Sequence, residues 1–147
     1  MYARALGRED EMLDEHGGST VLMISPARLR FSAGQEHIVC GRMTSKGPLR
    51  WHTACCKTPL ANTIPRDGVP FMAVHPLCIV EQPITDHGGP VRGVVNTTRT
   101  GEKIGRLYTG LVISRMVWLL LMWRLQGAHK KFPFPDVAPH RLERIEG

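Results

Sequence analysis

Two adjacent cysteines, Cys55 and Cys56, are the residues whose types and spacing most suggest chemistry. A thiolate can ligate zinc or attack an electrophile, and His52 lies near enough in sequence to join a metal site. Zinc loops usually space two cysteines as C-x-x-C, so an adjacent pair needs a strained loop or contributes a single ligand. The residues alone leave four alternatives: a metal site, a reactive or redox thiol, a vicinal disulfide, or unremarkable buried thiols.

The other candidate residues carry weaker signals. Cys40 and Cys78 fall on strand-like or loop segments, where a cysteine is usually a small core residue. His75 lies in an apolar run, which favours a hydrogen-bonded core histidine over a ligand. The acidic residues between 10 and 15 suit a solvated helical turn that ends at glycines 17 and 18. No P-loop, nucleophile elbow, H-E-x-x-H or dinucleotide-binding motif occurs.

The elements that must position these residues are predicted to be short strands followed by one helix. Apolar runs that alternate or are β-branched, with glycine and proline between them, are typical of an antiparallel meander. The predicted strands are residues 20–24, 28–33, 37–43, 49–53, 71–75 and 91–96. Residues 54–63, which hold the cysteine pair, are predicted to be a loop. The predicted fold class is therefore mainly β, with antiparallel sheets and one long C-terminal α-helix.

An apolar helix of about twenty residues is predicted over 107–125, ending near Gly127. Arg115 near its middle argues against a membrane span, because a central arginine costs about 2.5–3.5 kcal/mol on the insertion scale. We expect the helix to pack against the sheet. The alternative is an exposed apolar patch for dimerisation or membrane-surface contact, which Trp118, Trp123 and the flanking basic residues would suit.

The composition is typical of one globular domain: 147 residues, 42% hydrophobic and 22% charged. The formal net charge of +6 is spread over single basic residues and pairs, of which Lys130 and Lys131 are the densest. Because no aromatic-interleaved basic motif occurs, we expect no nucleic-acid partner. No apolar run of signal-peptide length follows Met1, so we expect a cytoplasmic location with reduced thiols.

The cysteine pair lies in a stretch that resembles a known family. The stretch reads Leu49-Arg50-Trp51-His52-Thr53-Ala54-Cys55-Cys56-Lys57-Thr58-Pro59-Leu60. Its second half is similar to the C-x-x-C-G-T-P-L segment of the glutathione-dependent formaldehyde-activating enzyme and centromere protein V family. Residues 25–31, 51–63, 89–96 and 132–134 together resemble an uncharacterised bacterial branch of that family, which also carries a helical region and a Pro/Phe tail.

The resemblance implies a zinc-binding β-tent domain over residues 1–100. An apolar helix over 101–128 and a proline-rich extended tail over 129–147 would follow it. The resemblance also implies a carbon–sulfur lyase that acts on thiol–formaldehyde adducts, with zinc as cofactor and a small thiol such as glutathione as partner.

The zinc motifs of the family are only partly present. The family's C-x-C pair does not occur, and the first cysteine of C-x-x-C is replaced by Thr53. Cys56 matches a zinc ligand by position, and Cys55 could substitute for a lost ligand by a one-residue slip. We therefore expect a degenerate or absent metal site and a β domain whose first strands are missing before Met1. The alternative function is a non-enzymatic β domain whose helix mediates self-association or membrane-surface contact.

Overall fold

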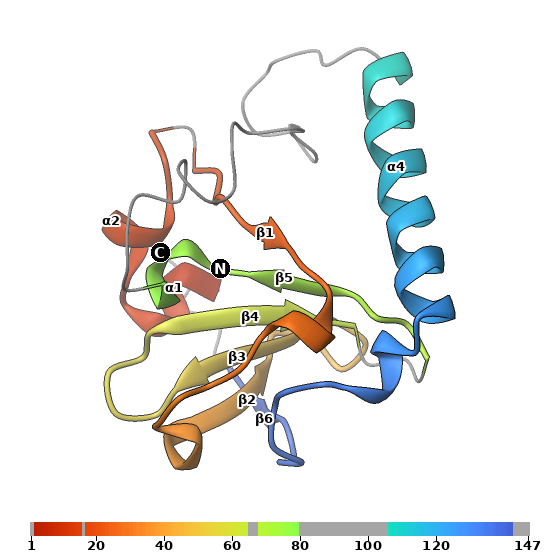
Figure 1. Ribbon diagram of the computed structural model, residues 1–147. Helices are drawn as coiled ribbons and strands as arrows, with labels where there is room; N and C mark the ends of the chain where they lie inside the picture. The colour runs from red at the N-terminus through yellow and green to blue at the C-terminus, as the bar shows by residue number, and fades with distance from the viewer. Residues whose placement is uncertain (1, 16, 65–67, 80–105, 143–147) are drawn as a thin grey trace.

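Six strands form one sheet in the computed structural model, in the order β1-β5-β4-β3-β2-β6 (Figure 1). The model describes residues 2–15, 17–64, 68–79 and 106–142, with the side chains of its last segment described from residue 110. The strands are β1 (Leu22–Met23), β2 (Ile38–Arg42), β3 (Leu49–Thr53), β4 (Pro59–Thr63), β5 (Met72–Val74) and β6 (His140–Arg141). All neighbouring strands are antiparallel except β2 and β6, which are parallel. The predicted class, mainly β with one long C-terminal helix, is confirmed.

Three α-helices accompany the sheet in the described residues. They are α1 (Tyr2–Leu6), α2 (Glu9–Met12) and α4 (Arg106–Leu125). The predicted acidic turn exists as α2, but it ends at Met12 and not at the glycines, because Leu13 already has extended backbone. Short 3-10 turns occupy Pro26–Arg28, Gln35–His37, Pro76–Cys78 and Ala128–Lys130.

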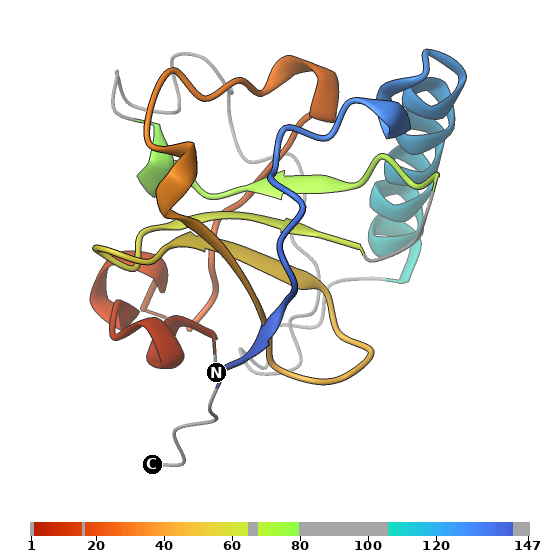
Figure 2. The same ribbon diagram turned by 90° about the horizontal axis from the view of Figure 1, so that it is seen from below.

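The two faces of the sheet bury different residues, because side chains alternate along β3. On one face the indole of Trp51 stacks on Phe134, with ring centroids 4.4 Å apart, and donates a hydrogen bond to Thr63. Phe134 belongs to the segment between α4 and β6, which crosses this face of the sheet in Figure 2. On the other face, Arg50 and His52 lie against the ring of Tyr2 from α1. The sheet is therefore covered by both ends of the chain.

Two sequence predictions about the strands are wrong. Residues 28–33 were expected to form a strand, yet Pro26 starts a 3-10 turn and the chain continues as irregular structure. The alternation there instead lets Leu29 and Phe31 reach the core without a strand partner. Residues 54–63 were expected to be a loop, yet β4 occupies the second half of that segment. Proline is tolerated at the first residue of a strand, which is where Pro59 lies.

The other predicted strands vary in outcome. β2, β3 and β5 lie within their predicted ranges, whereas β1 keeps only two of the five residues predicted for it. The segment 91–96 lies outside the described residues.

The helix α4 has the predicted position but not the predicted packing. It stands beside the sheet in Figure 1, and no side chain between residues 110 and 125 is buried. Large apolar side chains are exposed on it, with Leu125 73% and Leu111 63% accessible. The described residues thus do not show the expected packing of this helix on the sheet: Val112, Met116 and Trp123 are half-buried, but no α4 side chain joins a core cluster. No helix in the described ranges combines the length and apolarity that a membrane crossing needs.

Candidate functional site

The turn between β3 and β4 holds both cysteines. It is closed by main-chain hydrogen bonds from Thr53 N–H to Thr58 C=O (3.1 Å) and from Lys57 N–H to Thr53 C=O (3.0 Å). Lys57 has a φ of 54°, the left-handed conformation that glycine adopts most easily. The turn is thus tight enough to hold a non-glycine residue in an unfavourable backbone region.

The thiol of Cys56 lies between two threonine hydroxyls. Its Sγ is 3.0 Å from Thr53 Oγ1 and 3.1 Å from Thr58 Oγ1. Thr53 Oγ1 also accepts a hydrogen bond from the Thr58 main-chain N–H at 2.9 Å. That contact occupies an oxygen lone pair, so the hydroxyl proton of Thr53 is free to point at the sulfur. Cys56 itself is exposed to solvent.

These contacts favour the charged form of Cys56. The hydroxyls of Thr53 and Thr58, then the Thr58 main chain and the Cys55 thiol, lower the pKa of Cys56 from its ordinary value to about 6. Because the group is exposed, almost no desolvation opposes this shift. These contacts therefore favour the thiolate, which is the nucleophilic form of cysteine.

Arg8, in the link between α1 and α2, fixes the turn from outside. Its guanidinium donates two hydrogen bonds to the Cys56 carbonyl oxygen, at 2.9 and 3.2 Å, and also pairs with Glu11. The N-terminal helices are thereby tied to the cysteine turn. Arg8, Thr53 and Thr58 went unnoticed as functional residues in the sequence. The pattern T-x-x-C-x-T is the signal that could have identified the two threonines.

Cys55 is the second thiol of the site. It is exposed, and its Sγ lies 3.7 Å from Cys56 Sγ. A disulfide requires about 2.05 Å, so the two cysteines are reduced neighbours and not a vicinal disulfide. The arrangement leaves Cys55 placed to donate a weak hydrogen bond to the Cys56 thiolate.

The described residues do not fit a zinc ion at this turn. A structural zinc takes four protein ligands and a catalytic zinc about three, whereas Cys55 and Cys56 supply two. His52, considered as a possible third ligand, instead lies against Tyr2 and His140 on the α1 face of the sheet. In the part of the chain that the structure describes, no group of three or more histidine, cysteine, aspartate or glutamate side chains could hold a metal.

The remaining sequence candidates have core positions. Cys40 is 1% exposed, and burial raises its pKa. Cys78 is half-buried and donates to the His75 carbonyl oxygen at 2.9 Å, and its pKa is also raised by burial. His75 is buried, and its pKa is lowered to about 4 by burial and by the nearby charge of Arg50. These three residues are structural, as the sequence suggested.

Comparison with known families assigns the chain to one of them. The family profile that matches is described as a family of unknown function (DUF6151) and covers residues 1–99, about two thirds of the chain, so the protein belongs to this family. No curated protein and no solved structure matches the chain. The cysteine turn lies within the matched range, whereas α4 and β6 lie beyond it.

Proposed function

We propose that this protein uses the Cys56 thiolate to form and break carbon–sulfur bonds with small aldehydes such as formaldehyde. The observation that carries the proposal is the position of Cys56 Sγ, exposed to solvent and within 3.1 Å of two threonine hydroxyls. A stabilised thiolate open to solvent is the arrangement that nucleophilic cysteines require. No metal takes part in this proposal, because the described donor set is too small for zinc.

The proposed step balances without an oxidant or a reductant. The thiolate sulfur attacks the aldehyde carbon, a carbon–sulfur bond forms, and the carbonyl π pair moves to oxygen. The oxygen takes a proton from water, which gives an S-hydroxymethyl cysteine when the aldehyde is formaldehyde. The reverse step releases the aldehyde, which a small soluble thiol such as glutathione can then capture by the same addition.

The resemblance found in the sequence supports this proposal at two positions. Thr53 occupies the place of the first cysteine in C-x-x-C and lies beside Cys56, as that spacing requires. Lys57 occupies the place of the glycine and has the left-handed backbone that a glycine would adopt without strain. The turn therefore keeps a geometry suited to the motif, while a hydroxyl replaces the thiol that a metal would need.

Alkylation kinetics test the thiolate. The rate of reaction with iodoacetamide, measured against pH, should inflect near the Cys56 pKa of about 6. The double variant Thr53→Val/Thr58→Val removes both hydroxyls but keeps their shape, so its inflection should rise toward the ordinary cysteine value of about 8.5. Cys56→Ser should lose the fast reaction, and the matched variant Cys55→Ser should keep it.

Carbon-13 NMR tests the aldehyde chemistry directly. Addition of ¹³C-labelled formaldehyde should produce a hemithioacetal resonance in the wild-type protein and in Cys55→Ser but not in Cys56→Ser. An alkylation inflection above pH 8 in the wild type, or equal adducts at both cysteines, would contradict the proposal.

A second candidate function rests on the exposed face of α4. Leu111, Trp118 and Leu125 recur at intervals of seven residues on this face, and Val117 and Leu121 lie between them. We propose that this α4 face, defined by these five residues, binds the surface of an anionic membrane. Tryptophan together with basic residues is typical of helices that lie in the membrane interface.

Charge favours a lipid surface over a second copy of the chain. Residues 106–135 contain five basic residues and no aspartate or glutamate. Among the described side chains, Arg115, Arg124, Lys130 and Lys131 are exposed. Each such cation contributes about 1 kcal/mol near an anionic bilayer. Two copies of this helix would bring like charges together with no carboxylate to pair with them.

Vesicle flotation tests the lipid proposal. The protein should float with vesicles that contain phosphatidylserine and much less with phosphatidylcholine alone. The double variant Trp118→Ser/Leu121→Ser should lose flotation, whereas Ile79→Ser, which changes an exposed apolar residue outside α4, should not. If Trp118→Ser/Leu121→Ser instead abolished a dimer seen by sedimentation, with no lipid binding in the wild type, the face would belong to a second copy.

A further inference from the structure

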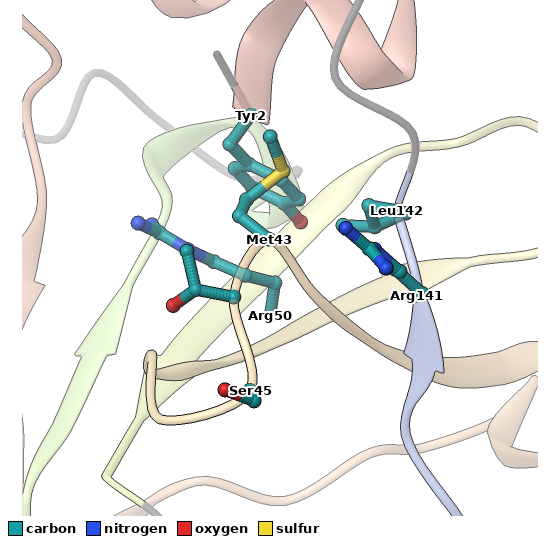
Figure 3. Close-up of a pocket in the computed structure, with 7 residues that line it drawn as sticks. Tyr2, Met43, Ser45, Arg50, Arg141 and Leu142 are labelled. Atoms are coloured by element: carbon teal, nitrogen blue, oxygen red, sulfur yellow. The ribbon is translucent and has the colours of Figure 1, made fainter.

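A cavity of about 520 Å³ lies between α1, the β2–β3 turn and β6. This volume is in the range of small-molecule sites, which is about 300–1,000 Å³. Figure 3 shows Arg50 and Arg141 on opposite sides of it, with Tyr2 and Met43 between them and Leu142 beside Arg141. The cavity thus combines two cations with an apolar middle.

Arg50 lines this cavity, and no carboxylate in the described part of the chain forms an ion pair with it. Its guanidinium lies 5.0 Å from the centre of the Tyr2 ring, and its Nε is buried without a hydrogen-bond partner. The ion pairs Arg4–Glu9, Arg8–Glu11 and His37–Glu36 of the described residues include neither Arg50 nor Arg141. Burial lowers the pKa of Arg50, and the interaction with the Tyr2 hydroxyl partly offsets this shift. A half-buried cation whose buried Nε has no hydrogen-bond partner favours the binding of an anion.

The second cation comes from the far end of the chain. β6 pairs with β2 in parallel, with His140 opposite Gly41 and Arg141 opposite Arg42. Leu142 then donates its N–H to the Arg42 carbonyl oxygen at 2.8 Å and packs with Tyr2 and Met43 in one hydrophobic cluster. This pairing fixes Arg141 at the wall of the cavity, although its side chain remains exposed.

We propose that this cavity binds a small organic acid, with its carboxylate held by Arg50 and Arg141 and its apolar part against Tyr2, Met43 and Leu142. A guanidinium presents paired N–H donors that match a carboxylate. The apolar lining gives the non-acidic part of the ligand a surface to cover. An inorganic anion would satisfy the cations but leave this lining uncovered.

The site is separate from the cysteine turn and does not rest on the proposed thiol chemistry. Arg50 and Thr53 are near opposite ends of β3, three residues apart, which corresponds to about 10 Å along a strand. Cys56 follows beyond Thr53, in the turn. Loss of one site therefore leaves the other intact, and the two proposals can fail independently.

Methionine-methyl NMR tests the site with sodium benzoate as the probe. In protein labelled with ¹³C at the methionine methyl groups, the Met43 resonance, assigned with Met43→Leu, should shift and saturate as benzoate is added at constant ionic strength. Arg141→Met and Arg50→Met should each weaken binding by about tenfold or more. Arg50→Lys should weaken it less, and Arg115→Met, which removes an exposed cation from α4, should leave it unchanged.

Three results would overturn the proposal. One is a Met43 shift that grows without saturation, and another is an equal loss in Arg115→Met, since either would mean a general response to ions. The third is saturation by inorganic phosphate but not by benzoate, because that would make the site a plain oxyanion site. Arg141 is exposed, so Arg141→Met keeps the test valid even if Arg50→Met fails to fold.

Discussion

At the residue scale, the lowered pKa of Cys56 depends mainly on uncharged neighbours. Two hydroxyls and a main-chain group lower its pKa, whereas the nearby cation Arg8 is directed at the carbonyl oxygen of the turn. Dipoles of this kind act at short range and survive added salt better than ion pairs between exposed charges. The thiolate should therefore persist at high ionic strength.

His75 carries a pH prediction at the same scale. Its folded pKa of about 4 lies below the ordinary histidine value of about 6.5, because burial and the Arg50 charge oppose the imidazolium. The unfolded chain therefore binds more protons between these two values. The free energy of unfolding should fall by roughly 1–3 kcal/mol as pH drops through that window, and no further below it.

Urea unfolding followed by tryptophan fluorescence, between about pH 7 and pH 4, measures this loss. His75→Gln cannot titrate and should show a shallower dependence on pH. His37→Gln changes an exposed histidine and should keep the wild-type slope. Equal slopes in wild type and His75→Gln would show that other groups cause the acid loss.

The sequence reveals features of the site that depend on local residue types. It does not reveal features that depend on contacts formed only in the folded protein. From residue types alone, the cysteine pair is the most chemically suggestive feature of the sequence. The contacts of Cys56 were not predictable, because the threonine hydroxyls reach it only after the turn has closed. Thr53 reads in sequence as a lost zinc ligand, while in the folded turn it is a hydrogen-bond donor. The cavity was missed because residues 2, 50 and 141 meet only in three dimensions.

At the element scale, β6 can pair closely with β2 because Gly41 on β2 has no side chain. A Cβ at Gly41 would lie 2.6 Å from Leu142 Cγ and 2.7 Å from Cδ1, too close for any real contact. Gly41→Ala should therefore push Leu142 out of its cluster and weaken the β2–β6 pairing. We expect a loss of about 1–3 kcal/mol in the free energy of unfolding, as for an overpacked core.

Two measurements check this change. The urea midpoint should fall, and trypsin should cleave after the exposed Arg141 faster than in the wild type. Gly110→Ala is the matched control, because nothing lies within 4 Å of its added Cβ and alanine favours a helix. If Gly41→Ala left both readouts unchanged, Leu142 would have room that its contacts do not indicate.

Elements defined by residues close in sequence were predictable, and elements defined by distant partners were not. β2, β3 and α4 were located because local periodicity and turn residues define them. β4 was missed because its small and polar residues acquire strand structure by pairing with β3 and β5. Residues 28–33 were wrongly predicted to be a strand. Their alternating apolar side chains pack in the core, but the backbone pairs with no other strand of the described residues.

At the scale of the whole molecule, the sheet order shows why class was easier to predict than topology. The central β2–β5 meander joins neighbours in sequence, and it accounts for the correct mainly-β class. The two edge strands pair with strands that are not their neighbours in sequence: β1 pairs with β5, and β6 pairs with β2. Each edge strand has two residues, too few to leave a periodic signal. The exposure of α4 side chains is likewise not predictable where the helix is apolar on every side, as it is over residues 116–123.

The contact between Tyr2 and Leu142 has a consequence for synthesis. Both side chains belong to one buried cluster, and Tyr2 also donates its hydroxyl to the Trp51 carbonyl oxygen. As the chain leaves the ribosome, the β2–β5 meander can pair early, since its hairpins are local. The helix α1, however, is made long before Leu142 and must wait for that residue before its cluster can close. The α1 face therefore assembles after the β2–β5 meander has been made, and until it does the Arg50 side of the sheet lacks its complete cover.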